Sequence, residues 1–241
     1  MEPLKTQKPS SDDANNTVNT HSVFNQSQAL ENTNLFDDDI ALQQALTSYA
    51  PSADVDALRD YGQRCGSAEV IAWGFDANEQ KPQFDSHDRF GHRVDEVRFH
   101  PSYHKLMKMA LEQGIHAMPW QGDIAQAHTQ RAAYSYMQSQ VEAGHGCPLT
   151  MTFASVPTLN LTPNIAKQWL PKVLAQGYEP ENKPYFEKQA VTIGMGMTEK
   201  QGGSDVRANT SVARAVGAQG PGELYEITGH KWFLSAPMCD A

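Results

Sequence analysis

The sequence lacks the signatures of several protein classes. Its 241 residues contain only three cysteines, Cys65, Cys147 and Cys239, and no C-x-x-C pair. This usage favours a reducing compartment with buried, inert thiols over a disulfide framework. No apolar run approaches the length of a bilayer span, and the first residues lack the apolar segment of a secretory signal. We therefore expect a cytoplasmic protein without a membrane partner.

Positive charge is also scarce. The formal net charge is −9, and no run of Lys or Arg is present. Residues 1–39 hold seven acidic residues against two lysines, so most of the imbalance lies there. Nothing in this composition provides the basic surface that nucleic acids require. Residues 1–20 are almost entirely polar, which predicts a disordered tail.

Two common nucleotide-binding fingerprints are absent as well. The glycines at 194 and 196 lack the third glycine of G-x-G-x-x-G, and no glycine precedes a Lys-Ser or Lys-Thr pair. A dinucleotide bound here would therefore use a β scaffold rather than a helix that follows a Gly-rich loop.

Helical patterns dominate the first three-quarters of the chain. A first helix is expected after the three aspartates at 37–39, with Pro51 beyond its end. Apolar residues at three- and four-residue steps predict further helices over 54–75, 101–112, 124–143, 148–159 and 164–174. Pro157 is expected to interrupt the fourth of these. The charged stretch 83–98 predicts an extended excursion or a loose hairpin.

The last quarter of the chain has β character. Strands are predicted over 190–197, 211–216, 224–228 and 231–235. The fold class is therefore α+β: an all-helical domain over 21–186, then the first strands of an antiparallel, β-barrel-like domain over 187–241. So few strands form an incomplete sheet, which indicates part of a longer polypeptide.

The stretch from Val191 to Ala208, V-T-I-G-M-G-M-T-E-K-Q-G-G-S-D-V-R-A, stands out for chemistry. Gly202 and Gly203 can take a positive φ and let the backbone approach a ligand. The amides and hydroxyls around them suit an anionic group such as a diphosphate. Taken alone, this cluster is more often a plain turn between strands.

Two motifs carry a family resemblance. G-M-T-E-K-Q-G-G-S-D-V-R-A (196–208) and G-H-K-W-F-L-S (229–235) resemble the paired signatures of the acyl-CoA dehydrogenase family. R-V-D-E-V-R-F-H-P-S-Y-H (93–104) and Q-V-E-A-G-H-G-C-P-L-T-M-T-F-A (140–154) resemble its alkylation-response AidB subfamily. The resemblance covers roughly residues 21 to 241.

The resemblance implies an FAD-dependent oxidoreductase that forms an α,β double bond in an acyl-CoA thioester, and a homotetramer. It assigns no catalytic residue and no metal ligand to this chain. The implied FAD-binding residues are Met195, Gly196, Met197, Thr198, Gly202, Gly203, Ser204, Phe233, Leu234 and Ser235. Three of these, Thr198, Ser204 and Ser235, would also contact the substrate.

Two alternatives remain open at this point. One is a DNA-binding alkylation-response protein with a mainly structural FAD site, whose DNA contacts would lie beyond these residues. The other is an inactive fragment.

Further candidates have simpler interpretations. His100 and His104 have the spacing of a metal pair, but a polar packing role is favoured. Glu199 is expected to satisfy loop amides rather than to act as a base. Phe153 could border an acyl pocket. The remaining aromatics in this group are predicted to pack in the core or between helices: Phe99, Tyr103, Tyr134 and Tyr136.

Overall fold

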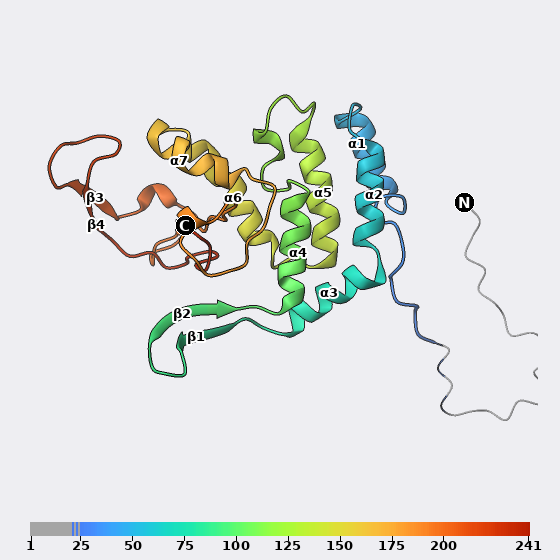
Figure 1. The fold of residues 1–241 in the computed structure, drawn as a ribbon. Coiled ribbons are helices and arrows are strands. Elements are labelled where there is room, and N and C mark those ends of the chain that lie inside the picture. Colours follow the sequence, from blue (N-terminus) through green and yellow to red (C-terminus); the bar gives the residue numbers. More distant parts are fainter. Residues whose placement is uncertain (1–20, 22, 24) are drawn as a thin grey trace, which may run out of the picture. The chain divides into compact units, whose positions relative to one another are not determined.

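The computed structural model describes residues 21, 23 and 25–241, so the predicted tail over 1–20 lies outside the described residues. Contacts divide the chain into two units, 1–30 and 31–241. Figure 1 shows the elements of the second unit in chain order: α1 (Ile40–Tyr49), α2 (Val55–Cys65), α3 (Ala68–Glu79), β1 (Gln83–His87), β2 (Arg93–Arg98), α4 (Pro101–Glu112), η1 (Met118–Trp120), α5 (Ala127–Val141), α6 (Gly146–Leu159), α7 (Pro163–Val173), η2 (Tyr185–Glu187), η3 (Val206–Ala208), β3 (Val212–Ala215) and β4 (Tyr225–Thr228).

The order of these elements confirms the α+β class. Helices dominate up to Val173, and the later part carries short antiparallel strands. β1 pairs with β2 in the hairpin expected over 83–98, and β3 pairs with β4 in a second one (Figure 1). The boundary between two domains near residue 187 stays a prediction. In the described part of the chain, no helix combines the length and apolarity that crossing a membrane requires.

Two helix starts follow the local sequence. Asp39 is the N-cap of α1, and its Oδ1 accepts a hydrogen bond from the Leu42 amide at 2.8 Å. Pro101 occupies the first turn of α4, where a missing amide hydrogen costs nothing. Both predictions are confirmed.

The single helix predicted over 54–75 is wrong, because α2 ends at Cys65 and α3 begins at Ala68. A neighbouring segment causes the break. A Cβ on Gly66 would meet the Thr33 carbonyl oxygen at 2.1 Å, and the Thr33 amide donates to Gly66 O at 3.2 Å. Ser67 then caps α3 through a bond from the Val70 amide to its Oγ. The close approach of Thr33 to Gly66 depends on tertiary packing, so the helical pattern of the sequence does not reveal it.

The interruption predicted at Pro157 is also wrong, because α6 continues through it to Leu159. A proline leaves the carbonyl four residues earlier without its helical donor. Here that carbonyl belongs to Phe153, and Trp120 Nε1 donates to it at 3.1 Å. A side chain from η1 therefore replaces the lost backbone bond.

The strands predicted over 190–197 and 231–235 are not regular strands. Isolated bridges take the place of a ladder, one at Met195–Ser235 and one just beyond the first segment at Glu199–Lys231. Between these bridges, the Met197 carbonyl accepts side-chain donors, Asn209 Nδ2 at 3.0 Å and Lys231 Nζ at 3.2 Å. A carbonyl engaged in this way is not available for a continuous ladder. The other two predicted strands exist in shortened form as β3 and β4.

The main core is formed by one set of helix faces. Leu58, Leu106 and Met137 bring α2, α4 and α5 together, and Cys65 and Tyr134 are buried with them as predicted. A smaller cluster joins α6 and α7 to the segment that follows, through Val156, Val173 and Val191. Tyr136, predicted to pack in the core or between helices, is 50% exposed, and its hydroxyl donates to Asp39 Oδ2 at 2.9 Å.

A buried polar network fixes the start of α6. His145 Nδ1 bonds Glu142 Oε2 at 2.8 Å, and His145 Nε2 lies 3.0 Å from Gln138 Nε2. The amide of Gln138 also accepts from the Tyr61 hydroxyl of α2. The hydrogen bond from His145 lowers the pKa of Glu142 to about 2. Both ring nitrogens of His145 therefore have polar partners, which links the end of α5 to the start of α6.

Candidate functional site

The two family motifs lie against each other. Met195 and Ser235 exchange backbone hydrogen bonds of 3.0 and 2.7 Å, and the Trp232 amide donates to Thr198 O at 2.9 Å. The bridges at 195–235 and 199–231 flank the triplets 196–198 and 232–234, which therefore lie across from one another. Residues separated by more than thirty positions thus form one surface, here called the motif wall.

Glu199 holds this arrangement together. Its side chain is 2% exposed, and it accepts from the amides of Thr210 at 2.7 Å and Ser211 at 2.9 Å. Gln201 Nε2 donates at 2.9 Å, and Lys231 Nζ lies 3.1 Å from the other oxygen. These hydrogen bonds, the one from Gln201 foremost, hold the pKa of Glu199 well below its usual range. The prediction that Glu199 satisfies loop amides is confirmed.

The helical region positions the first motif through α6. Thr152 is fully buried, and its Oγ1 accepts from the Ile193 amide at 3.0 Å while donating to Pro148 O at 2.7 Å. A hydroxyl that both donates and accepts can join a helix to an extended segment. This contact aligns the residues that lead into the motif wall.

A second anchor holds the segment after the wall. Asp240 Oδ2 accepts from the Thr192 amide at 2.8 Å, and Asp240 Oδ1 pairs with Lys188 Nζ at 2.7 Å. Both ends of the motif pair are therefore fixed to the same stretch, residues 188–194. Lys188 is itself buried, which protects this ion pair from solvent screening.

The motif wall is apolar and exposed at its centre. Met197 is 49% exposed, Phe233 is 65% exposed and Leu234 is 57% exposed. Thr198 and Ser235 are half-buried, and Ser204 is exposed at the turn. A flat apolar face bordered by hydroxyls is the form of surface that an aromatic cofactor ring requires.

Glycines keep the wall open. A Cβ on Gly196 would meet Leu234 Cδ1 at 2.6 Å, and one on Gly203 would meet Thr198 Oγ1 at 2.8 Å. Gly202 has a φ of +135° and open space where a side chain would be. The structure thus pairs residues 195–198 with 232–235 and places the Gly202–Gly203 turn, which precedes Ser204, against Thr198 and Glu199. The roles of the ten residues as ligands stay predictions.

Some positioning residues escaped the sequence interpretation. Lys231 lies inside the second motif. A single lysine in this mostly apolar stretch could have indicated a buried carboxylate partner. Thr152, Asn209 and Asp240 act through long-range contacts, and no local pattern marks them.

The two histidines make packing contacts. The Ser102 amide donates to His100 Nδ1 at 3.3 Å, and His104 Nδ1 lies 2.7 Å from the Tyr178 hydroxyl. These contacts confirm the polar packing role. Over residues 21, 23 and 25–241, no group of three or more His, Cys, Asp or Glu side chains is arranged to hold a metal.

The structure tests the prediction for Cys147 but not the one for Phe153. The prediction of a buried thiol at Cys147 is wrong, because the residue lies exposed in the first turn of α6. The ring of Phe153 packs against Trp120 with centroids 5.1 Å apart, and the Arg131 guanidinium lies 3.8 Å from its centre. A border to an acyl pocket stays a prediction.

Comparison with known proteins agrees with the paired motifs. The profile of the adaptive response protein AidB N-terminal domain matches residues 25–180. The chain belongs to the acyl-CoA dehydrogenase family. Within it, the chain is 42% identical over 224 residues to AidB of Escherichia coli (strain K12), covering 92% of this chain and 41% of that protein.

A second curated relative and two solved structures are also similar to this chain. Acyl-CoA dehydrogenase family member 11 of Caenorhabditis elegans is 27% identical, with 86% of this chain and 33% of that protein covered. The apo-form structure of Bd2924 superposes with a TM-score of 0.71 at 27% identity, covering 89% of this chain and 42% of the other. The structure of Caenorhabditis elegans ACDH-11 in complex with C11-CoA gives a TM-score of 0.67 at 24% identity, covering 92% and 37%. The chain thus spans between about a third and about two-fifths of the length of these curated relatives.

Proposed function

We propose that the motif wall binds FAD, and that the chain is the N-terminal part of an AidB-like acyl-CoA dehydrogenase. The observation that carries this proposal is the pairing of the two motifs, which joins Met197 and Phe233 into one exposed apolar face with Thr198 and Ser235 at its edge. Exposed aromatic and thioether side chains beside a glycine turn are costly to leave in water, and a bound ring would cover them.

The residues of the wall fit the parts of FAD. Phe233 and Met197 would pack on the isoalloxazine ring, and the hydroxyls of Thr198 and Ser235 would donate to its polar edge. The backbone at Gly202 and Gly203, together with Ser204, would receive the diphosphate, since a turn without side chains lets amide groups approach an anion. When bound, the flavin would supply a hydride acceptor. Glu199 and Lys231 keep these groups in place.

The acyl-CoA thioester is the proposed substrate of the whole protein, with α,β-dehydrogenation as the reaction. Its support is the family membership, together with the acyl-CoA carried by the structure of the Caenorhabditis elegans relative. Thr198, Ser204 and Ser235 would contact the substrate as well as the flavin. None of the residues in this chain is proposed as the catalytic base.

Flavin titration tests the proposal. Adding the 241-residue chain to FAD is expected to quench flavin fluorescence at a stoichiometry of one. Gly203→Val should abolish the quenching, because its side chain would displace Thr198 from the wall. Gly217→Ala is the matched control, since a Cβ there meets nothing within 4 Å.

Two results would contradict the proposal. One is a colourless preparation that takes up no FAD under any loading condition. The other is equal quenching by the Gly203→Val and Gly217→Ala variants. The reaction itself is tested on the full-length protein by the appearance of an enoyl-CoA and bleaching of the flavin. DNA binding, an inactive fragment, the homotetramer and the cytoplasmic location stay predictions.

A further inference from the structure

A separate cavity lies at the base of the β1–β2 hairpin. It has a volume of about 880 Å³, which is within the range of small-molecule sites. Its walls come from the hairpin, the start of α4, the loop 178–188 and residues 237–240. None of the ten proposed FAD-binding residues lines this cavity. One side is formed by the segment 93–104, whose sequence stood out but has no part in the proposed flavin site.

Aromatic rings form one wall of this cavity. Phe99 and Tyr103 are stacked, with centroids 3.9 Å apart and planes 13° apart. His104 lies 5.5 Å from Tyr103 and stacks on Tyr178 at 5.8 Å. Burial lowers the pKa of His104 and raises that of Tyr178, which favours the neutral form of both groups, and their polar atoms are hydrogen-bonded to each other. The wall is therefore uncharged and presents the electron-rich faces that attract cations.

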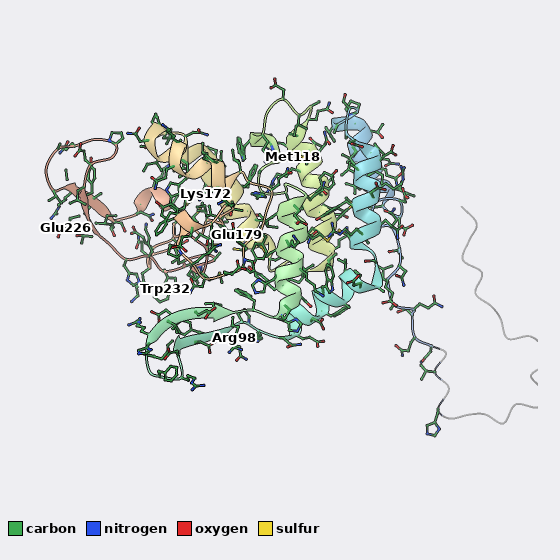
Figure 2. All side chains as sticks on the ribbon, viewed as in Figure 1. Arg98, Met118, Lys172, Glu179, Glu226 and Trp232 are labelled. Carbon is green, nitrogen blue, oxygen red and sulfur yellow. The ribbon has the colours of Figure 1, made fainter. Side chains whose placement is uncertain are left out.

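The charges around this wall are mostly negative. Five carboxylates and two lysines line the cavity. Both lysines are already paired, Lys183 with Glu179 at 2.5 Å and Lys188 with Asp240 at 2.7 Å. Figure 2 labels Glu179 in this loop.

Of the other three carboxylates, Asp95 pairs with Arg93 at 2.6 Å, which leaves Glu96 and Glu181 without an ion-pair partner. The side chains of Glu96 and Glu181 make no hydrogen bond or ion pair with any described residue. The cavity thus has an excess of negative charge beside its aromatic wall, which disfavours an anionic occupant such as the phosphates of CoA.

The hairpin is shaped to present its acidic residues here. The pairing of β1 with β2 shifts between Asp85 and His87, where β2 holds one extra residue. Asp95 lies in this bulge and takes a φ of 48°. A bulge changes the direction in which side chains point, and a non-glycine residue in the left-handed region is uncommon. The result is that Asp95 and Glu96 line the cavity while Arg98 pairs with Asp85 outside it.

We propose that this cavity binds an organic cation with an apolar or aromatic body. The body would lie on Phe99, Tyr103 and Tyr178, and the cationic group would lie near Glu96 and Glu181. An aromatic face and an unpaired carboxylate attract the same charge, so the two features select one class of ligand. The cavity shares no residue with the proposed flavin site, so this proposal does not depend on that one.

Calorimetric titration of the 241-residue chain tests the proposal with three matched probes. They are 2-phenylethylammonium, uncharged 2-phenylethanol and anionic phenylacetate. The cation is expected to bind about fivefold or more tightly than the alcohol, as expected for a contact worth about 1 kcal/mol. Phenylacetate should not bind, and added salt should weaken only the cation.

Charge-neutral variants locate the site. Glu96→Gln and Glu181→Gln are each expected to weaken binding of the cation roughly two- to fivefold, the range of one exposed charge contact. Glu226→Gln is the control, because Glu226 is exposed on β4 (Figure 2) and should leave the affinity unchanged. Circular dichroism confirms that the variants fold. Equal affinity for all three probes would overturn the proposal, as would variants at 96 and 181 that behave like the control. Binding of a basic peptide but not of 2-phenylethylammonium would overturn the assignment to a small cation.

Discussion

The helical region 31–173 and the segment 187–241 are stabilised in different ways. Leu106 and Met137 of the first region are fully buried and belong to one continuous core. In the second, Leu224, Ile227 and Phe233 are largely exposed. Its position depends on polar contacts instead, chiefly those of Glu199 and Asp240. The comparison shows that apolar burial stabilises the helical region of this chain, whereas hydrogen bonds hold the segment that carries the proposed binding surface.

The proposed flavin site would account for this difference. An apolar side chain that is already buried cannot contact a ligand, so a binding face must leave some apolar area exposed. An exposed face contributes less burial free energy to folding, so other contacts must stabilise the segment that carries it. Here hydrogen bonds to ionised groups provide it, and these are stronger than those between neutral groups.

The largest expected effect tests the difference in burial. Leu106→Ala should lower the free energy of unfolding by about 2–5 kcal/mol, because it removes a fully buried side chain. Ile227→Ala should change it by less than about 0.5 kcal/mol, because Ile227 is 77% exposed. Chemical denaturation followed by circular dichroism measures both. Similar losses in the two variants would remove the contrast.

A smaller effect concerns pH in the helical region. His116 is buried, its Nε2 donates to Ala175 O at 3.1 Å, and burial lowers its pKa to about 4. The unfolded chain takes up the proton near pH 6.5, before the folded one does, so stability falls as the pH drops from 6.5 to 4. The loss should reach roughly 3 kcal/mol. Denaturation midpoints across this range measure it, and His116→Gln should flatten the profile. An equally steep profile in that variant would contradict the assignment.

The smallest effect is local and falls in the second region. Glu199→Gln should speed hydrogen exchange at the amides of Thr210 and Ser211 and across the motif pair, while α4 and α5 stay protected. Because its pKa is lowered, Glu199 stabilises the fold above about pH 4.5, and this is lost as the pH falls toward the lowered pKa. Exchange mass spectrometry reads both regions in one experiment. Glu226→Gln is the matched control, and uniform loosening of the whole chain would argue against a local role.

Much of the architecture could be predicted from local signals. The aspartate cap at 39 and the proline at 101 marked helix starts, because capping chemistry acts within one turn. The two motifs identified the candidate wall through their resemblance to the family signatures, because a glycine turn alone is more often a plain turn between strands. The break at Gly66 could not be predicted, since it depends on the approach of Thr33.

The sequence by itself determined that a helical region precedes a region with short strands, and it contains the two motifs of the wall. Periodicity, caps and turn residues act over a few positions, so they can be read along the chain. Only the tertiary structure decided that α6 runs through Pro157, that Glu199 and Lys231 join the motifs, and that an acidic, aromatic cavity forms beside the hairpin. Each of these depends on contacts between residues far apart in the chain. Such contacts exist only after the core has brought the elements together.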